Sequence, residues 1–278
     1  MTTLSASLVL YNNSPDTFGK VIECFLASIV EGQLVIVDNS PVRLSHPLFE
    51  HHRVRYIAVH ENLGFGGGHN HALAVLRGSL AIAHLFLNPD VDFDPDVLPT
   101  LLAAIERDPT LAAIMPQIVN PDGTPQPLAK LLPTPFDLIL RRFIPLPGLR
   151  RRRERVYELH GLPLDRPTEV PTLSGCFLLV QSAALALTGG FDTRYFMYME
   201  DVDLIRRIAD HGRVTFEPSV IVRHGYGKGS YRDPSLLRHH VRSATRYFDK
   251  WGWVFDPVRR YRNRTALMRL RATADTTD

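Results

Sequence analysis

Continuous apolar runs that end in polar clusters constrain the fold of this 278-residue chain more than any other feature. The run at residues 33–37 (QLVIV) is too continuous for a strand with one wet face, and is typical of a strand buried on both faces of a parallel sheet. Segments with helical periodicity, such as residues 16–29, alternate with these runs, so we expect an α/β fold with a doubly wound, mostly parallel sheet. The sequence predicts strands at residues 5–11, 33–37, 54–59, 80–87, 112–115, 172–180 and 214–222.

Four polar clusters lie where successive predicted strands end. Ligands of open α/β sheets bind beyond the carboxyl ends of the strands, so we expect these clusters to converge on one site. Four loops of similar chemistry at one edge indicate a ligand site more specifically than any single loop does. The clusters are Asn12-Asn13, Asp38-Asn39-Ser40, Asn62 to Asn70 and Asn88 to Asp92.

Asp38 and the glycine-rich stretch after the third strand each have two interpretations. A carboxylate at the end of a buried strand suits the N3–H donor of uracil or thymine, but an isolated aspartate at such a place also initiates turns. The backbone N–H groups of Gly64 to Gly68 suit phosphate oxygens. A dinucleotide fingerprint with Asp90 as its acidic residue is disfavoured, because His69 stands at the third glycine position and the loop does not follow the first strand.

Three side chains with oxygen atoms, Asn88, Asp90 and Asp92, follow the fourth predicted strand. Alternate residues of an extended segment point the same way, so we expect all three on one side. Hard oxygen ligands that leave positions open suit Mg²⁺ or Mn²⁺ shared with a diphosphate; the alternative is a solvated loop. His224 ends the last strand and is a candidate third metal ligand or diphosphate contact, with Lys228 as a countercharge.

Residues 196–204 place three carboxylates, Glu200, Asp201 and Asp203, within four positions at the start of a predicted helix. The N-terminal dipole of that helix offsets part of their mutual repulsion. A carboxylate held beside its neighbours and half shielded by aromatic side chains is a reasonable general base. An acidic first helical turn is also common without catalysis, so this segment alone leaves both interpretations open.

The distribution of charge and the two cysteines limit the partners and the compartment. The formal net charge is only +3, but Arg141–Arg155 holds seven arginines and Arg232–Arg271 holds eleven Lys or Arg residues. Such clusters, mixed with aromatic residues, suit an anionic membrane surface. They also suit a nucleic acid, but acidic strand-end loops would repel its phosphates, so no nucleic-acid partner is expected.

Cys24 and Cys176 are expected to be buried thiols of a cytoplasmic protein, and neither a signal peptide nor a membrane-spanning segment is predicted.

Taken together, the motifs resemble those of the inverting glycosyltransferases of GT-A fold, and within them the bacterial rhamnosyltransferase-like branch. They occur in the order of that family and cover roughly residues 5–230. The matching stretches are Leu10-Tyr11-Asn12, Val37-Asp38-Asn39-Ser40, Asn62-Leu63-Gly64-Phe65-Gly66-Gly67-Gly68-His69-Asn70, Leu87-Asn88-Pro89-Asp90, Ser174-Gly175-Cys176-Phe177-Leu178-Leu179, Gly190-Phe191-Asp192, Glu200-Asp201-Val202-Asp203 and His224.

The resemblance implies roles for the catalytic and donor-binding residues. Asp201 is implied as the catalytic base, with Glu200 beside it to contact the acceptor or to orient the base. Asp38 is implied to recognise the pyrimidine base, and the stretch after Asn62 to border the phosphates. The implied donor-binding set comprises Tyr11, Asn12, Asp38, Asn62, Gly64, Phe65, Gly66, Gly67, Asn70, Asn88 and Lys228.

The implied cofactor is Mg²⁺ or Mn²⁺. Asp90 matches the last residue of an Asp-x-Asp metal motif, and His224 is implied to complete the site for the metal and the diphosphate. Asn88 replaces the first aspartate of the motif, which removes one carboxylate from the metal, so Asp92 is a candidate compensating ligand. The Gln-x-x-Arg-Trp signature of processive relatives is absent from the sequence, which favours the addition of single sugars.

The resemblance also implies an overall activity. We expect inverting transfer of one sugar, L-rhamnose from dTDP-rhamnose, to a saccharide or lipid-linked acceptor in bacterial cell-surface polysaccharide synthesis. A non-catalytic nucleotide-sugar-binding module and a sugar-nucleotide pyrophosphorylase are the alternatives. The enzyme is expected in the cytoplasm, docked by its arginine clusters on the inner face of the cell membrane, and no oligomeric state is predicted.

The expected organisation has a GT-A domain at residues 1–230 and a basic helical C-terminal extension at 231–278, with a helix at 239–251. Within the domain, residues 1–119 form the nucleotide-sugar half and residues 172–230 the acceptor and catalytic half. Residues 120–171 are expected to be a long connection with one short helix at 136–143.

Overall fold

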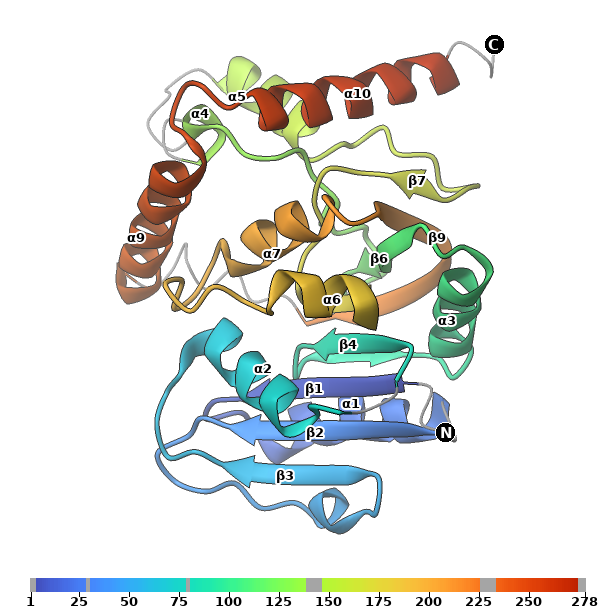
Figure 1. Ribbon diagram of the computed structural model, residues 1–278, viewed down its shortest axis with the longest axis vertical. Coiled ribbons are helices and arrows are strands. Elements are labelled where there is room, and N and C mark those ends of the chain that lie inside the picture. The colour runs from blue at the N-terminus through green and yellow to red at the C-terminus, as the bar shows by residue number, and fades with distance from the viewer. Residues whose placement is uncertain (1–3, 29–30, 79–80, 139–146, 226–233, 275–278) are drawn as a thin grey trace.

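The computed structural model describes residues 4–28, 31–78, 81–138, 147–225 and 234–274 (Figure 1). Strands and helices alternate through its first half, as the sequence predicts. The elements of this half are β1 (Leu4–Leu10), α1 (Pro15–Ser28), β2 (Gly32–Asp38), the 3-10 helix η1 (Pro47–Glu50), β3 (Val54–Ala58), α2 (Gly64–Val75), β4 (Ala83–Leu87), β5 (Val91–Phe93), α3 (Val97–Arg107) and β6 (Leu111–Val119). The second half contains α4 (Pro135–Leu138), α5 (Pro147–Tyr157), β7 (Thr168–Glu169), β8 (Phe177–Gln181), α6 (Ser182–Thr188), α7 (Glu200–Ile208), β9 (Arg213–His224), α9 (Pro234–Trp251) and α10 (Pro257–Ala274).

A nine-stranded sheet forms the centre of the molecule, in the order β3-β2-β1-β4-β8-β6-β9-β5, with β7 paired to β9. Strands β1 to β4 are parallel to one another, and β6 and β9 are parallel to each other. Strand β8 is antiparallel to both β4 and β6, so it joins two parallel blocks whose strands point the same way. The carboxyl ends of β1, β2, β4 and β9 therefore lie along one edge, where a ligand site is expected. The predicted α/β fold with a mostly parallel sheet is confirmed.

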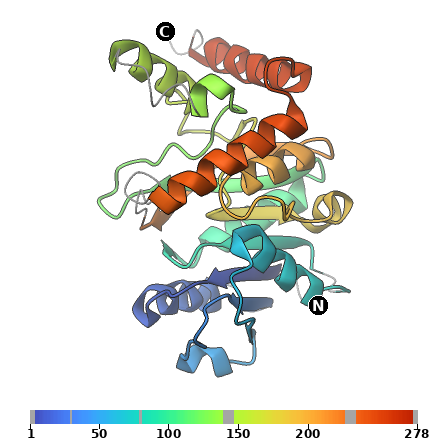
Figure 2. The ribbon, with the colours of Figure 1, turned by 90° about the vertical axis from the view of Figure 1, so that its left-hand side faces the viewer.

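Helices cover both faces of the sheet. Helix α2 packs on β1 and β2, α6 on β8 and α7 on β6, whereas α1 packs on β5 and α3 on β6 and β9. The C-terminal helices lie outside these layers: α9 runs along the side of the molecule towards α10, which caps its upper end (Figure 2).

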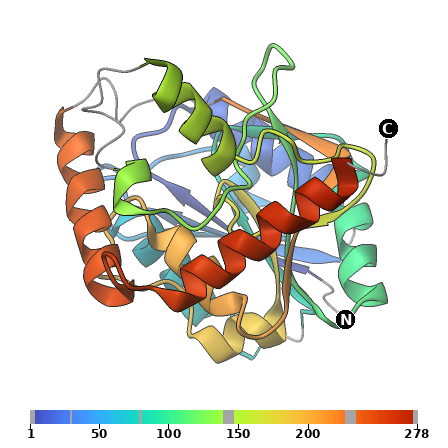
Figure 3. The same cartoon turned by 90° about the horizontal axis from the view of Figure 1, so that it is seen from above.

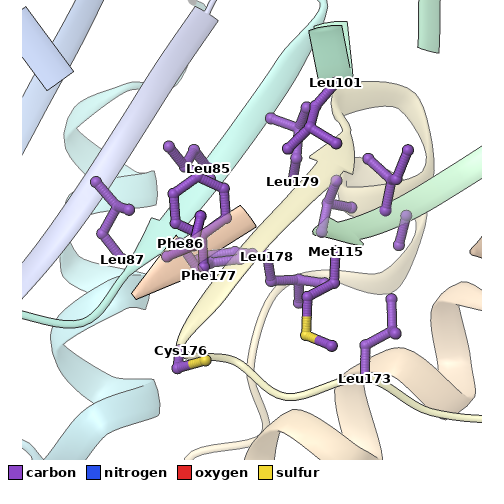
Figure 4. Packing of buried hydrophobic residues seen from close by; sticks show 14 of the residues in the cluster. Leu85, Phe86, Leu87, Leu101, Met115, Leu173, Cys176, Phe177, Leu178 and Leu179 are labelled. Atoms are coloured by element: carbon purple, nitrogen blue, oxygen red, sulfur yellow. The ribbon is translucent and has the colours of Figure 1, made fainter. Parts of the chain in front are cut away.

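The apolar core is continuous across the junction between the two parallel blocks. Phe86 of β4 and Phe177 of β8 are fully buried there, and Leu101 of α3 and Met115 of β6 belong to the same cluster (Figure 4). A smaller cluster joins α9 to the turn that precedes α7. Its buried members are Tyr195, Met199, Ala244, Tyr247 and Phe248. The C-terminal extension is thus packed against the segment that carries the carboxylates.

The predictions for residues 120–171 and for the C-terminal region were partly wrong. The arginine run at 150–153 lies in α5 and not in an irregular connection. Arginine is a good helix former, but α5 is mostly exposed and therefore has no apolar stripe by which its sequence could be recognised as helical. Of the helix predicted at 136–143, the described part is α4, and the remainder lies outside the described residues. Helix α9 begins before residue 239, and α10 lies in the extension that the sequence predicts to be helical, where no bounds are predicted for it. Cys176 is buried as expected, but Cys24 is only partly buried. None of the helices in the described part of the chain is both long and apolar enough to cross a bilayer.

Candidate active site

A cavity of about 490 Å³ lies at the carboxyl edge of the sheet. The ends of β4 and β9 contribute Asn88, Asp90 and His224 to its wall, and the start of α7 contributes Glu200 and Asp201. Other lining side chains come from residues 128–157 and from the segment before β8, among them Lys130, Tyr157 and Cys176. The structure therefore brings together the predicted catalytic residues and two of the three predicted metal ligands, Asp90 and His224, from segments more than 100 residues apart.

Two consecutive left-handed residues place the carboxylate pair. Tyr198 has φ of 68° and Met199 has φ of 69°, a conformation that costs a non-glycine residue of the order of 1 kcal/mol. The backbone then enters α7 at Glu200. Acidic side chains occupy the first turn of this helix and Arg206 and Arg207 the last, which is the distribution that the helix dipole favours.

Asp201 is held as a carboxylate by backbone donors. Its Oδ2 accepts a hydrogen bond of 3.0 Å from the N–H of Gly175, and its Oδ1 accepts one of 2.8 Å from the N–H of Val202. A Cβ atom on Gly175 would lie 3.2 Å from both Asp201 Cβ and the Phe65 ring. The glycine of the Ser174-Gly175-Cys176 stretch is thus needed for the backbone to approach the carboxylate this closely.

Glu200 is the partner that keeps its proton. It is 6% exposed, and its Oε2 is buried without a hydrogen-bond partner among the residues that the structure describes. Burial and then the charge of Asp201 raise the pKa of Glu200 to about 8. Burial also raises the pKa of Asp201, but the backbone donors and the charge of Lys130 lower it in part. Within the pair, the backbone donors therefore favour the charge on Asp201 and the proton on Glu200.

The third carboxylate of the segment, Asp203, has a structural role. It is fully buried, and its Oδ2 accepts a hydrogen bond of 2.9 Å from Arg207. Its Oδ1 accepts hydrogen bonds from Lys250 (2.6 Å) and Trp251 (2.8 Å) of α9. Asp203 therefore ties the helix that carries Asp201 to the C-terminal extension.

Asp90 and His224 form a second polar group in the cavity wall. Strand pairing of β5 with β9 sets them side by side, and His224 Nε2 lies 3.3 Å from Asp90 Oδ1 and 3.2 Å from Asn88 Nδ2. Gln126 fixes the orientation of the imidazole. Its amide nitrogen donates to Asn120 Oδ1 and to the main-chain oxygen of His224, both at 2.8 Å. Its Oε1, 3.1 Å from Nδ1, is then the acceptor for the Nδ1–H of His224, and the Nε2 lone pair faces Asp90 and Asn88.

Asp92 does not belong to this group, so its assignment as a compensating metal ligand is wrong. The turn at Pro89–Asp90 breaks the alternation on which that assignment depended, and Asp92 lies in β5. Its Oδ2 forms an ion pair of 2.7 Å with Lys20 of α1. Lys228 lies outside the described residues.

The glycine-rich stretch is packed closely against other segments of the fold. It forms the first turns of α2, where three glycines allow close packing. A Cβ at Gly64 would lie 2.1 Å from the carbonyl oxygen of Phe196, one at Gly66 would lie 2.9 Å from Phe191 Cβ, and one at Gly68 would lie 2.7 Å from a Val9 methyl group. Gly67 meets only the Leu63 side chain.

Two other predicted donor-binding residues also have partners within the fold. The Asn70 side chain forms two hydrogen bonds of 2.8 Å with the backbone of Phe191, one as donor and one as acceptor. Asn62 Oδ1 accepts a hydrogen bond of 3.0 Å from Gly64 N. Phe65, by contrast, does line the cavity.

Asp38 is fully buried at the end of β2. Its two oxygens accept hydrogen bonds from the N–H groups of Ser40 and Leu44, both at 2.9 Å, and from the Tyr56 hydroxyl. The turn-initiating interpretation of Asp38 is therefore confirmed. Because the side chain is fully buried, contact with a base requires a local rearrangement. Tyr11 and Asn12 are exposed at the neighbouring end of β1.

Sequence reasoning missed Lys130 and Gln126. Lys130 faces the cavity, with its Nζ 3.4 Å from Glu158 Oε1. Gln126 is buried behind His224. Both lie in the segment that was interpreted as an irregular connection. Lysine is scarce in a chain that otherwise uses arginine, and that scarcity was the available signal for Lys130.

Comparison with solved structures identifies the fold. The fold is similar to that of GalNAc-T7 (TM-score 0.57, 14% identity, 90% of this chain and 50% of that chain). It is also similar to that of the mannosyltransferase PcManGT from Pyrobaculum calidifontis (TM-score 0.56, 17% identity, 97% and 75%). The fold of the chain is thus the GT-A fold.

The family follows from the sequence itself. The model described as Glycosyl transferase family 2 matches residues 6–181, and the chain belongs to this family. It is 35% identical over 223 residues to the N-acetylglucosaminyl-diphospho-decaprenol L-rhamnosyltransferase of Mycobacterium tuberculosis, covering 74% of this chain and 71% of that protein. It is 24% identical to the rhamnosyltransferase WbbL of Escherichia coli K12, covering 90% and 98%. The resemblance to the rhamnosyltransferase-like branch is confirmed.

Proposed function

We propose that this enzyme transfers one L-rhamnosyl group from dTDP-rhamnose to an acceptor hydroxyl, with inversion at the anomeric carbon. The observation that carries the proposal is the Glu200–Asp201 pair in the cavity wall, of which one member keeps its proton while the other is held as a carboxylate. Such a division of charge suits a general base. The rhamnosyltransferase relatives support the choice of sugar.

Asp201 acts as the base in this proposal. It must lie within about 2.6–3.2 Å of the attacking hydroxyl to remove its proton. The hydroxyl oxygen forms a bond to the anomeric carbon as the bond to the diphosphate oxygen breaks on the opposite face. One displacement inverts the centre and needs no enzyme nucleophile. Protonated Glu200 can donate a hydrogen bond to the acceptor, and Lys130 adds positive charge to the wall.

The residues at Asp90 fit a divalent cation, Mg²⁺ or Mn²⁺. His224 donates its Nδ1–H to Gln126, so the lone pair of its Nε2 faces an oxygen of Asp90 at 3.3 Å. These two electron-rich atoms repel each other, and a bound cation would make their proximity favourable. One carboxylate, one imidazole and the amide of Asn88 suit Mn²⁺ well. When bound, the cation would neutralise charge on the departing nucleoside diphosphate. Among the described residues no three His, Cys, Asp or Glu side chains could hold an ion by themselves, so the diphosphate is expected to supply further ligands.

The donor and acceptor contacts complete the proposal. Residues 1–119 are the donor half, in which Tyr11, Asn12 and Asp38 border the nucleotide, and residues 172–230 form the acceptor half. The M. tuberculosis relative is named for a lipid-linked acceptor, a diphospho-decaprenol. A saccharide on a lipid diphosphate at the cytoplasmic face of the membrane, used for cell-surface polysaccharide, is the acceptor class we infer for this chain.

The substitution Asp201→Asn tests the proposal. Removal of the base should lower transfer by roughly 10²–10⁴-fold, while the thermal stabilisation given by dTDP-rhamnose with Mn²⁺ is kept. Asp96→Asn, at an exposed aspartate before α3, is the matched control and should keep full activity. Wild-type turnover in Asp201→Asn would contradict the assignment of the base. Donor binding without transfer in the wild-type protein would favour a non-catalytic binding module.

A further inference from the structure

We propose that the corner between α9 and α10, together with the outer face of α10, inserts into the headgroup region of an anionic lipid bilayer. This surface, called here the α10 face, comprises Val254, Phe255, Val258, Tyr261 and Met268 with the arginines that border them. The inference depends on the chemistry of the surface and not on the proposed sugar transfer.

Large apolar side chains are unusually exposed on the α10 face. Phe255 is 85% exposed, and Val254, Tyr261 and Met268 are 72%, 72% and 57% exposed. Val258, Tyr261 and Met268 are spaced by three and seven residues, so they lie along one side of the helix. Contiguous exposed apolar residues bordered by polar ones mark a surface that meets a partner or a membrane.

Helix α10 is fixed to the body of the protein by apolar and polar side chains, and its Ala266, Leu267 and Leu270 pack on the main core cluster. Its inner side is held by polar groups: Arg259 is 6% exposed and donates to the carbonyl oxygens of Pro133 and Trp253, and the Asn263 side chain forms two hydrogen bonds of 2.8 Å with the backbone of Leu132. Ala266 is buried beside them. Because the helix is fixed to the body in this way, the exposed apolar stripe is a stable feature of the folded protein.

Positive charge borders the stripe on both sides. Arg260, Arg264 and Arg271 are exposed along one flank, and Arg262 and Arg269 lie on the other, paired with Asp210 and Glu169. The sequence of α10 contains no acidic residue. Apolar side chains flanked by arginines are the composition of helices that lie in the interface of a bilayer, where arginine meets lipid phosphate.

Helix α5 extends the basic surface at the same end of the molecule (Figures 1 and 3). Arg150, Arg151, Arg152 and Arg155 are exposed on it. Its last residue, Tyr157, lines the active-site cavity. An acceptor carried on a lipid would therefore reach the cavity from the side that faces the membrane.

The charge distinguishes a bilayer from other occupants. A second copy of the chain, docked about a two-fold axis, would set the arginines of α10 against the same arginines, which is unfavourable. A nucleic acid would neutralise the arginines but would leave Val254, Phe255 and Met268 without an apolar environment. A bilayer surface satisfies both the charged and the apolar groups.

Vesicle co-sedimentation of the full chain tests the proposal. Wild type should bind vesicles of phosphatidylcholine with phosphatidylglycerol, and bind phosphatidylcholine alone much more weakly. Phe255→Ser and Tyr261→Ser should each weaken partitioning roughly tenfold, because each removes one aromatic ring from the inserted area. Arg260→Gln and Arg264→Gln should each weaken it roughly fivefold at low salt and much less at high salt.

Leu187→Ser is the matched control, because Leu187 is 69% exposed on α6, away from the α10 face. It should leave vesicle binding unchanged. Lipids brominated near the headgroup should quench the fluorescence of Trp253, which is 39% exposed at the corner. Binding by Phe255→Ser equal to that of wild type, or an absence of binding by folded wild type, would overturn the proposal. A wild-type dimer that Phe255→Ser converts to monomer would assign the α10 face to a second copy instead.

Discussion

Replacement of Glu200 by Gln should remove a pH dependence of stability that this buried carboxyl group imposes. Burial beside Asp201 raises the pKa of Glu200 from 4.5 to about 8. The unfolded chain releases the proton at its ordinary pKa, whereas the native state keeps it until about pH 8. The native state binds more protons in this window, so the free energy of unfolding falls as pH rises from 4.5 to 8.

The magnitude follows from the size of the pKa shift. With 1.36 kcal/mol for each unit, the destabilisation relative to a neutral side chain is about 1 kcal/mol at pH 5 and about 4 kcal/mol at pH 7.5. Glu200→Gln keeps the size of the side chain and has no proton to release. The variant should therefore gain about 3 kcal/mol of unfolding free energy over wild type between these two pH values.

Urea unfolding followed by circular dichroism, at about pH 5 and pH 7.5, measures this difference. Glu106→Gln, at an exposed position of α3, is the matched control and should follow wild type at both pH values. An identical pH dependence in wild type and Glu200→Gln would refute the reasoning. It would mean that Glu200 is ionised in the native state, and the assignment of the negative charge to Asp201 would lose its basis.

Further substitutions, each with a matched control, test the support of His224 and the attachment of the C-terminal extension. Gln126→Leu removes the acceptor for the Nδ1–H of His224. It should weaken Mn²⁺ binding in the presence of a nucleoside diphosphate by roughly 10–100-fold, measured by electron paramagnetic resonance. Gln126→Glu keeps an acceptor and should bind Mn²⁺ at least as tightly as wild type. Asp256→Ala leaves the buried Arg206 guanidinium without its bidentate partner at 2.6 and 2.7 Å and should lower the free energy of unfolding by about 3–5 kcal/mol. Asp210→Ala, at the exposed partner of Arg262, should lower it by no more than about 1 kcal/mol.

The predictions that succeeded rest on patterns that are local in sequence. An uninterrupted apolar run such as residues 33–37 is best buried as a strand that is covered on both faces. Strand β2 is such a strand. The polar residues that follow such runs were expected at one edge because parallel strands end together. Asn88, Asp90 and His224 do meet there.

The predictions that failed depended on backbone geometry that local patterns do not determine. Alternation along a strand predicts that Asp92 lies beside Asp90. A turn before β5 changes the direction of the Asp92 side chain, which forms an ion pair with Lys20 instead. Gly64 packs against the carbonyl oxygen of Phe196, and Gly66 and Gly68 pack against side chains. Nothing in the local sequence separates that use of glycine from phosphate binding. Gln126 and Lys130 acquire their positions from long-range packing of residues 120–171.

The order of strands in the sheet has a consequence for biosynthesis. Strands β1 to β4 pair only with one another and with β8, so they can assemble as soon as residue 87 has been synthesised. The free side of β4 then presents unpaired backbone groups until β8 emerges, and such an edge invites association with other chains. The contact between Asn88 and His224 joins residues 136 positions apart, and high sequence separation makes a contact slow to form. A nascent chain can therefore form the sheet of β1 to β4 early, whereas the cavity wall that contains Asn88 and His224 is complete only after β9 has been synthesised.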